Sequence, residues 1–297
     1  MQQGQFWKGR LQMSVSALFP SHVSIVQNPR PSRASPFRPR AVAGAMCMTL
    51  RLERDGPIGR LLIERAEKRN ALNQEMWDRL PVLLAHAMAD RAIRVVVLQS
   101  AIPGIFSAGA DIAELVAHKA NPAWREGNQI AINKAQHDLA RAAKPTIAFI
   151  DGDCVGGGCG LALACDIRVA TSRSRLGITP ARLGLVYPLH DTKLLVDLVG
   201  SGQAKKMLYT GDLISAEEAL RIRLIEEIAD DADALALRIA DNSAHSTRET
   251  KHFVRRVLDG QSDEDSDSKR VFAEAFTGAD FAEGSAAFIE KRKPEFR

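Results

Sequence analysis

The chain has 297 residues, of which 45% are hydrophobic and 26% are charged, an ordinary balance for a globular protein. This length is enough for one large hydrophobic core or for two smaller ones. No apolar run reaches the roughly 18 residues that a membrane-spanning helix requires, so the sequence predicts no membrane segment.

The positive charge of the chain is concentrated at its N-terminus. Residues 1–52 hold seven of the 40 Lys and Arg residues and none of the 36 Asp and Glu residues, so the remainder has three more acidic than basic residues. A mildly acidic body with 5% aromatic residues lacks the positive field and the stacking groups of a nucleic-acid surface. RNA binding through the basic first 52 residues stays open as a weaker alternative.

Residues 1–45 differ in composition from the rest, because Pro and Arg cluster in 28–33 and again in 36–40. No apolar periodicity emerges there, so we predict a disordered basic extension. The absence of acidic residues also fits a mitochondrial targeting peptide, but the proline density opposes a targeting helix. We favour a start at Met46 or Met48 and a cytoplasmic protein, with a mitochondrial location as the alternative.

Three of the four cysteines lie close together, at Cys154, Cys159 and Cys165, and the fourth is Cys47. Their spacings differ from the paired CxxC pattern of a zinc site. Small buried thiols are therefore the favoured interpretation, and no metal site is predicted.

An α/β pattern begins at about residue 48. Runs rich in β-branched residues predict strands, and segments with helical periodicity and capping residues predict helices between them. The strands are expected at 49–53, 58–63, 94–99, 146–150 and 166–171, and the helices at 73–90, 110–120, 128–143 and 158–165. Beyond residue 200 almost every segment is helical in pattern. This organisation predicts an α/β core over residues 46–230 and a helical C-terminal region over 231–297.

Two glycine-rich turns each follow a predicted strand and precede a predicted helix. The first is Phe106–Ile112, and the second runs from Asp151 to Gly160 and contains Gly156-Gly157-Gly158. Free N–H groups at the start of a helix bind negative charge. Two such turns suggest a pair of N–H donors for an oxyanion. Neither turn has the pattern of a nucleotide-binding loop.

Five segments in order resemble the crotonase superfamily, the enoyl-CoA hydratase/isomerase family. They are residues 65–73, 106–112, 156–166, 208–220 and 288–296, and the resemblance extends from about residue 48 to the end. The resemblance implies a spiral of ββα units with a helical C-terminal region that supports trimers, often paired into hexamers. It also implies an acyl-CoA thioester as substrate, with CoA entering as part of that substrate and no separate cofactor.

The resemblance assigns functions to individual residues by motif position. The oxyanion N–H groups fall on Ala110 and Gly157. The residues implied to hold the CoA group are Lys68, Ala71, Ala108, Asp111, Ile112, Gly156 and Lys291.

The sequence departs from the family at the two glutamates with which its hydratases activate water. The position of the first is Gly160, and alignment on Leu183-Gly184 places Pro180 at the second. Neither residue transfers protons, and general acid–base catalysis contributes roughly 10²–10⁴-fold in rate. Efficient hydration is therefore not expected.

The remaining polar residues favour an enolate-forming reaction that needs no base. Residues 179–187 are similar to the methylmalonyl-CoA decarboxylase branch, in which Tyr187 has a counterpart, and His190 is a candidate proton donor. Decarboxylase-like chemistry is the preferred reaction. A catalytically inactive acyl-CoA-binding subunit and a weak hydratase or isomerase are the alternatives.

Overall fold

The computed structural model describes residues 49–296. The predicted extension 1–45 and Cys47 lie outside the described residues. The described residues belong to one compact unit, and the boundary expected at 230/231 falls inside it. Among the described helices, none is long and apolar enough to cross a bilayer.

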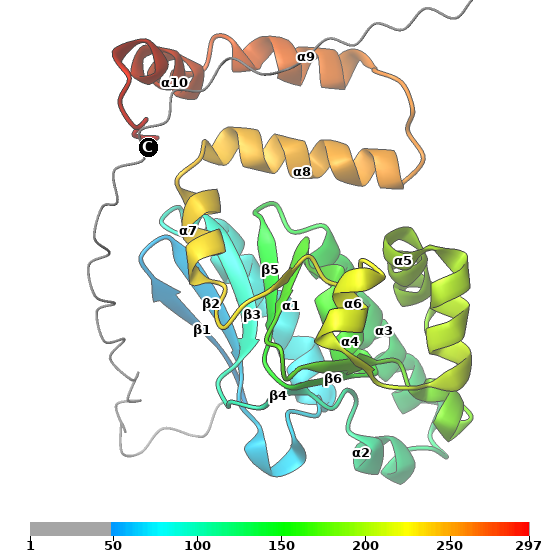
Figure 1. The fold of residues 1–297 in the computed structure, drawn as a ribbon. Helices are drawn as coiled ribbons and strands as arrows, with labels where there is room; N and C mark the ends of the chain where they lie inside the picture. Colours follow the sequence, from blue (N-terminus) through cyan, green and yellow to red (C-terminus); the bar gives the residue numbers. More distant parts are fainter. Residues whose placement is uncertain (1–48, 297) are drawn as a thin grey trace, which may run out of the picture. The chain divides into compact units, whose positions relative to one another are not determined.

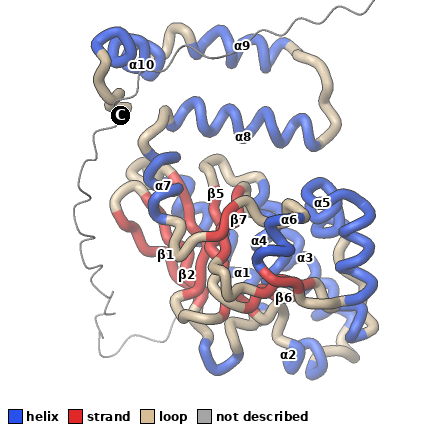
Figure 2. Tube along the Cα trace, in the orientation of Figure 1, coloured by secondary structure: helices blue, strands red, loops and turns tan. Residues whose placement is uncertain are grey.

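Two β-sheets form the centre of this unit (Figures 1 and 2). The larger sheet has the order β1-β2-β3-β5-β7-β10, in which β1 and β2 are antiparallel and the other neighbours are parallel. Its strands are β1 (Leu50–Asp55), β2 (Ile58–Ile63), β3 (Val95–Ser100), β5 (Thr146–Ile150), β7 (Ile167–Ala170) and β10 (Glu227–Ile228). The smaller sheet has the order β4 (Ile105–Ser107), β6 (Asp153–Val155), β8 (Arg175–Gly177) and β9 (Ile214–Ser215).

Helices follow the strand pairs and continue to the C-terminus. They are α1 (Gln74–Ala89), α2 (Ile112–Ala117), α3 (Pro122–Ala140), α4 (Gly157–Ala164), α5 (Leu189–Thr210), α6 (Ala216–Arg221), α7 (Asp233–Ala240), α8 (Ala244–Leu258), α9 (Ser266–Ala275) and α10 (Ala279–Glu290). Two short 3-10 helices span Ala66–Lys68 and Pro180–Leu183.

The strands alternate between the two sheets. In each of the pairs β3/β4, β5/β6 and β7/β8 the first strand joins the larger sheet and the second joins the smaller one. A helix follows each pair, so the chain repeats a ββα unit. This arrangement confirms the predicted α/β spiral with C-terminal helices.

Both faces of the larger sheet are buried, because successive side chains of a strand point to opposite faces. Val95 and Val97 of β3 pack with Ala236 of α7, while Val96 and Leu98 belong to the main core with α1. The continuous apolar run that predicted this strand reflects burial on both sides.

Several element boundaries differ from the prediction. Helix α3 begins at Pro122 instead of residue 128, because Asn121 caps it by accepting a hydrogen bond from the N–H of Trp124 at 3.1 Å. Proline is favoured in the first helical turn, where its missing N–H has no intrahelical role. Helix α5 begins at Leu189, before residue 200, beyond which the helical segments were predicted.

The three C-terminal helices lie at one side of the compact unit, with α8 between the sheets and the α9–α10 pair (Figure 1). Lys251 of α8 donates to the carbonyl of Lys144 at 3.0 Å and pairs with Asp166 at 2.8 Å. These contacts attach α8 to the loops beside β5 and β7.

Candidate active site

The two glycine-rich turns contact each other. Gly109 has φ +89°, and a Cβ at this position would lie 2.7 Å from the carbonyl oxygen of Val155 and 2.9 Å from the nitrogen of Gly157. Only glycine permits both this backbone conformation and this close approach. The turn is also fixed on its other side, where the N–H of Leu72 donates to the carbonyl of Gly109 at 2.7 Å.

The backbone N–H groups of Ala110 and Gly157 lie close to each other. A Cβ built on Gly157 would lie 3.4 Å from the nitrogen of Ala110. Within residues 49–296 neither N–H donates to another group, and Gly157 is the first residue of α4, where N–H groups lack intrahelical acceptors. The pair has the arrangement of a two-donor oxyanion site.

A cavity of about 560 Å³ opens beside these two donors. Ala110, Gly157 and Tyr187, which were expected at the site from the sequence, all line it, and so does Ile112. Its other apolar lining residues are Trp77, Leu115, Val116, Trp124, Ile132, Pro180, Leu183, Leu185, Val186 and Pro188. The cavity therefore combines a mostly apolar wall with main-chain donors, which is typical of a small-molecule site.

Gly160 lies one helical turn after Gly157 on α4, and it is enclosed by side chains from other elements. A Cβ at Gly160 would lie 2.9 Å from Oδ2 of Asp191 and 3.2 Å from the Tyr187 hydroxyl, with the Gln136 amide nitrogen closer still. The space beside Gly160, where the family has a glutamate, is thus filled by the side chains of Asp191, Tyr187 and Gln136.

The carboxylate in this group is almost completely buried. Asp191 is 1% exposed and lines the cavity. Burial raises the pKa of Asp191 to about 7, and the nearby Gln136 amide opposes the rise. Neither polar atom of that amide meets hydrogen-bond geometry with any described residue. A carboxyl group with this pKa exchanges protons near neutral pH.

The Tyr187 hydroxyl has no hydrogen-bond partner among the described residues. Burial raises the pKa of Tyr187 well above its ordinary value, and the Asp191 carboxylate adds to the rise. Tyr187 therefore stays protonated and remains able to donate a hydrogen bond into the cavity.

The predicted proton donor His190 is placed differently. It does not line the cavity, and its ring lies 6.0 Å from that of His137. Its Nδ1 lies 3.4 Å from Oδ1 of Asp191, and burial lowers the pKa of His190. Of the two neighbouring residues, Asp191 faces the cavity and His190 is on the side toward α3.

The residues expected to hold CoA lie in or beside the first turn, except for Gly156 and Lys291. Lys68 ends the first 3-10 helix, and the N–H of Ala108 donates to the carbonyl of Arg69. The Asp111 side chain caps α2 and pairs with Arg65 at 2.9 Å, so its carboxylate stabilises the fold.

Ala71 and Gly156 are also built into this region. Ala71 is buried and its carbonyl accepts from Arg65 at 2.9 Å, while the N–H of Gly156 donates to Gly177 at 2.9 Å. Lys291 is exposed at the C-terminal end of α10. The CoA-binding role of all seven residues stays a prediction.

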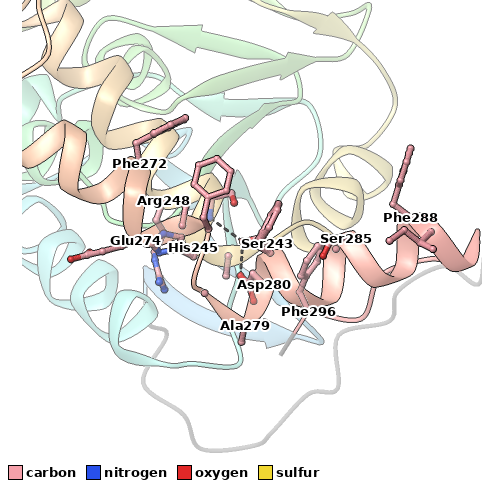
Figure 3. Close-up of a pocket in the computed structure, with 18 residues that line it drawn as sticks. Ser243, His245, Arg248, Phe272, Glu274, Ala279, Asp280, Ser285, Phe288 and Phe296 are labelled. Atoms are coloured by element: carbon pink, nitrogen blue, oxygen red, sulfur yellow. Dashed lines mark hydrogen bonds between the residues drawn. The ribbon is translucent and has the colours of Figure 1, made fainter.

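A larger hollow lies elsewhere, among α8, α9 and α10. It has a volume of about 950 Å³ and is lined by aromatic side chains together with Ser243 and Asp280 (Figure 3). The Ser243 hydroxyl donates to Asp280 at 2.5 Å and also caps α8. This hollow contains none of the predicted catalytic residues.

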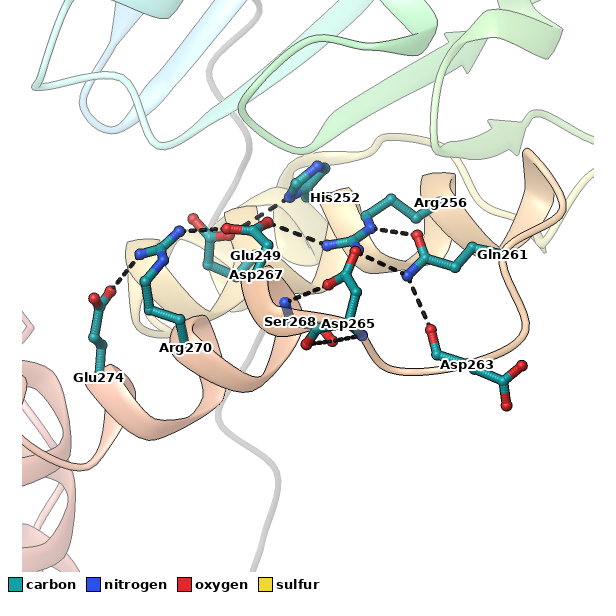
Figure 4. Close-up of polar contacts among 10 residues, drawn as sticks. All are labelled: Glu249, His252, Arg256, Gln261, Asp263, Asp265, Asp267, Ser268, Arg270 and Glu274. Atoms are coloured by element: carbon teal, nitrogen blue, oxygen red, sulfur yellow. Dashed lines mark hydrogen bonds and ion pairs between the residues drawn. The ribbon is translucent and has the colours of Figure 1, made fainter.

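The acidic segment before α9 is also structural. Arg256 of α8 pairs with Asp265 and with Asp267, and Gln261 joins the same group (Figure 4). Asp265 caps α9 through a reciprocal pair of hydrogen bonds with Ser268. The contacts hold α9 to α8.

The cysteine prediction is confirmed for the three described residues, which are buried and free. Burial raises the pKa of Cys165 to about 12, so its thiol is unreactive. In residues 49–296 no cluster of His, Cys, Asp and Glu is arranged to hold a metal.

Comparisons with known proteins agree with this architecture. The sequence profile of the family described as enoyl-CoA hydratase/isomerase matches residues 53–297. The chain is 34% identical over 255 residues to a short-chain-enoyl-CoA hydratase of Clostridium acetobutylicum, with 82% of this chain and 95% of that protein covered. A crotonyl-CoA hydratase of Syntrophomonas wolfei is 33% identical over 255 residues, with coverage of 82% and 96%.

A solved structure shares the fold as well. The crystal structure of an enoyl-CoA hydratase/carnithine racemase from Magnetospirillum magneticum has a TM-score of 0.80 and 32% identity, covering 85% of this chain and 96% of that one. The profile match and these relatives each cover most of the chain. The chain therefore belongs to the enoyl-CoA hydratase/isomerase family.

Proposed function

We propose that the protein binds an enoyl-CoA thioester and catalyses its hydration or isomerisation through a thioester enolate. The observation that carries the proposal is the pair of unpartnered N–H groups of Ala110 and Gly157 beside the cavity. The names of the relatives from Clostridium acetobutylicum and Syntrophomonas wolfei support a hydratase.

The donor pair acts on the thioester oxygen. Negative charge grows on that oxygen when the enolate forms, and two fixed N–H donors stabilise the charge without reorganisation. The surrounding apolar side chains exclude water, which strengthens this interaction. The fixed turn at Gly109 holds both donors in place.

A Gly157→Ala variant tests this role. The new methyl group would lie 3.4 Å from the nitrogen of Ala110 and from Trp77, in ordinary contact, so the fold is retained while the oxygen is displaced. We expect kcat for crotonyl-CoA to fall by roughly 10²–10³-fold, as for loss of one oxyanion donor. Gly127→Ala is the control, since a Cβ there meets nothing within 4 Å. Equal activity of both variants and the wild type would contradict the proposal.

Decarboxylation of a malonyl-type thioester is a second candidate, favoured by the unpartnered Tyr187 hydroxyl at the cavity wall. Loss of CO2 supplies the electrons of the enolate, so this reaction needs a proton donor and no base. The ionised Asp191 carboxylate opposes it by repelling the substrate carboxylate. Rapid CO2 release from methylmalonyl-CoA without hydration of crotonyl-CoA would establish it over the first candidate.

An inactive acyl-CoA-binding subunit is the remaining alternative. It predicts binding of CoA thioesters without turnover across a panel of acyl chains. Any turnover that Gly157→Ala abolishes and Gly127→Ala preserves excludes it.

We also propose that the C-terminal helices pack against further copies of the chain in a trimer or hexamer. Phe288 is 85% exposed and Ile289 is 79% exposed in the single chain, and large exposed apolar patches commonly mark protein interfaces. Light scattering should show an oligomer, and Phe288→Asp with Ile289→Asp should lower its mass. The cytoplasmic location and the mitochondrial alternative remain predictions.

A further inference from the structure

We propose that Asp191 of α5 is the general acid–base residue of this enzyme and replaces the glutamate that the family supplies from α4. The proposal rests on the proposed enoyl-CoA chemistry and identifies the group that moves the proton. It assigns a catalytic carboxylate to a helix where the sequence motifs of the family give none.

The first support is position. Gly160 is three residues after Gly157, and residues three apart lie on the same face of a helix. The Oδ2 atom of Asp191 is 2.9 Å from the place where a Cβ at Gly160 would be. The carboxylate thus lies one helical turn from the oxyanion donor, in the wall of the same cavity.

The second support is the set of unpartnered polar atoms around the carboxylate. Gln136 is fully buried, and its amide nitrogen and oxygen lack hydrogen-bond partners within residues 49–296, as does the Tyr187 hydroxyl. Gln136, Tyr187 and Asp191 all line the cavity. Buried polar groups in native proteins are nearly always hydrogen-bonded, so the two unpartnered side chains, Gln136 and Tyr187, beside the Asp191 carboxylate indicate that a bound molecule completes them.

Glycine at position 160 is required by this arrangement. Any Cβ there would overlap the Gln136 amide and approach Asp191 and Tyr187 too closely. The glycine therefore makes room for a carboxylate from another helix. The absence of a glutamate at position 160 therefore does not mean that the site has no group to transfer a proton.

The chemistry of hydration can be completed with this one carboxylate. A water oxygen bonds to C3 of the enoyl thioester and gives one proton to the ionised Asp191. The electron pair of the C2=C3 bond moves toward C1, and the thioester oxygen takes up negative charge between the N–H groups of Ala110 and Gly157. Asp191 then returns that proton to C2 as the carbonyl re-forms, so that one water is added in total.

The titratable groups facing Asp191 favour this role. The Nδ1 atom of His190 on the same helix lies 3.4 Å from Oδ1 of Asp191, and Tyr187 comes from the preceding loop. The buried thiol of Cys159 on α4 lies near Tyr187. Gln136 is the group contributed by α3. No Lys or Arg forms an ion pair with Asp191 in the described chain, and burial raises its pKa to about 7.

The decisive experiment compares the wild type with Asp191→Asn and with Asp197→Asn. The second variant carries the same change on the same helix, where Asp197 pairs with Lys193 at the surface. We expect Asp191→Asn to lower kcat for crotonyl-CoA by roughly 10²–10⁴-fold, the usual contribution of general acid–base catalysis. Asp197→Asn should retain wild-type kcat.

Two further measurements separate catalysis from folding. Calorimetry with butyryl-CoA should give the same affinity for the wild type and Asp191→Asn. The wild-type kcat should change with pH near 7, and this transition should be absent from the residual activity of Asp191→Asn. Exchange of the C2 hydrogens of butyryl-CoA with deuterated water, followed by NMR, reports the same proton transfer without hydration.

The outcomes distinguish the role proposed for Asp191 from the enoyl-CoA function on which it rests. Wild-type kcat and an unchanged pH profile in Asp191→Asn would overturn the assignment of Asp191 and leave the enoyl-CoA function standing. A wild-type protein that neither hydrates crotonyl-CoA nor exchanges the C2 hydrogens of butyryl-CoA would overturn both. Loss of hydration and exchange in Asp191→Asn, with butyryl-CoA affinity intact, supports both.

Discussion

The C-terminal hollow and the cavity beside the N–H groups of Ala110 and Gly157 differ in what their polar groups contact. In the C-terminal hollow of about 950 Å³, Ser243 contacts Asp280, Glu274 pairs with Arg270, and Ser285 donates to a carbonyl of its own helix. In the cavity of about 560 Å³ beside Ala110 and Gly157, Gln136 and Tyr187 have unpartnered atoms.

This difference supports the proposed location of the chemistry. Polar groups that satisfy one another stabilise the fold, as the Ser243 cap does for α8. Polar groups that are buried without partners destabilise it unless a ligand completes them. The smaller cavity therefore has the character of an active site, whereas the larger hollow has that of a packing surface.

The largest expected effect on stability comes from removing the charge of Asp191. Its pKa rises from an ordinary value of 3.8 to about 7 on folding, so between these values the folded state binds more protons than the unfolded state. Stability therefore falls as pH rises from about 4 to about 7 and is constant above, with a total loss on the order of a few kcal/mol.

Asp191→Asn should remove this loss. We expect the variant to unfold at a higher denaturant concentration than the wild type at pH 8, and the difference should shrink at pH 5. Asp197→Asn should show no such dependence. Equal pH dependence in the wild type and Asp191→Asn would show that the carboxylate is hydrated in the folded protein.

The next effect concerns the space at Gly160. Gly160→Ala forces apart the Gln136 amide and the Asp191 carboxylate, which are ends of side chains, so the chain still folds. Overpacking of this kind destabilises by roughly 1–3 kcal/mol. Because Asp191 must leave its position, we expect kcat for crotonyl-CoA to fall more than tenfold, a larger change than the stability loss explains. Gly202→Ala is the matched control, because a Cβ there meets nothing within 4 Å. Unchanged kcat in Gly160→Ala would separate Gly160 from the active site.

The sequence predicted the backbone part of the site. Glycine and helix-start signals are local, so the two turns were found from their own segments, whereas Ala110 and Gly157 were assigned by the family resemblance; both residues line the cavity. The spiral of ββα units followed from the family resemblance. Strands β6 and β8 were missed because three residues are too few to show a period of two.

The side-chain part of the site was harder to predict. Gln136 lies in the C-terminal part of α3, and no local pattern distinguishes it from a surface residue. His190 was favoured over Asp191 because its ordinary pKa is near neutral. Recognition of the helix start at Leu189 would have helped, since neighbouring residues of a helix point about 100° apart and only one can face the cavity.

The smallest expected effect on the free energy of unfolding comes from a change in the C-terminal hollow. This change should destabilise the protein, whereas Asp191→Asn should stabilise it. Ser243→Ala removes the cap of α8 and the hydrogen bond to Asp280, so we expect the free energy of unfolding to fall by about 1–2 kcal/mol. Ser285→Ala in the same hollow should change stability less, because that hydroxyl donates only within its own helix. Both variants should retain wild-type kcat for crotonyl-CoA. A loss of kcat in Ser243→Ala without loss of the oligomer would show that the larger hollow also takes part in catalysis, and the contrast between the two hollows would then fail.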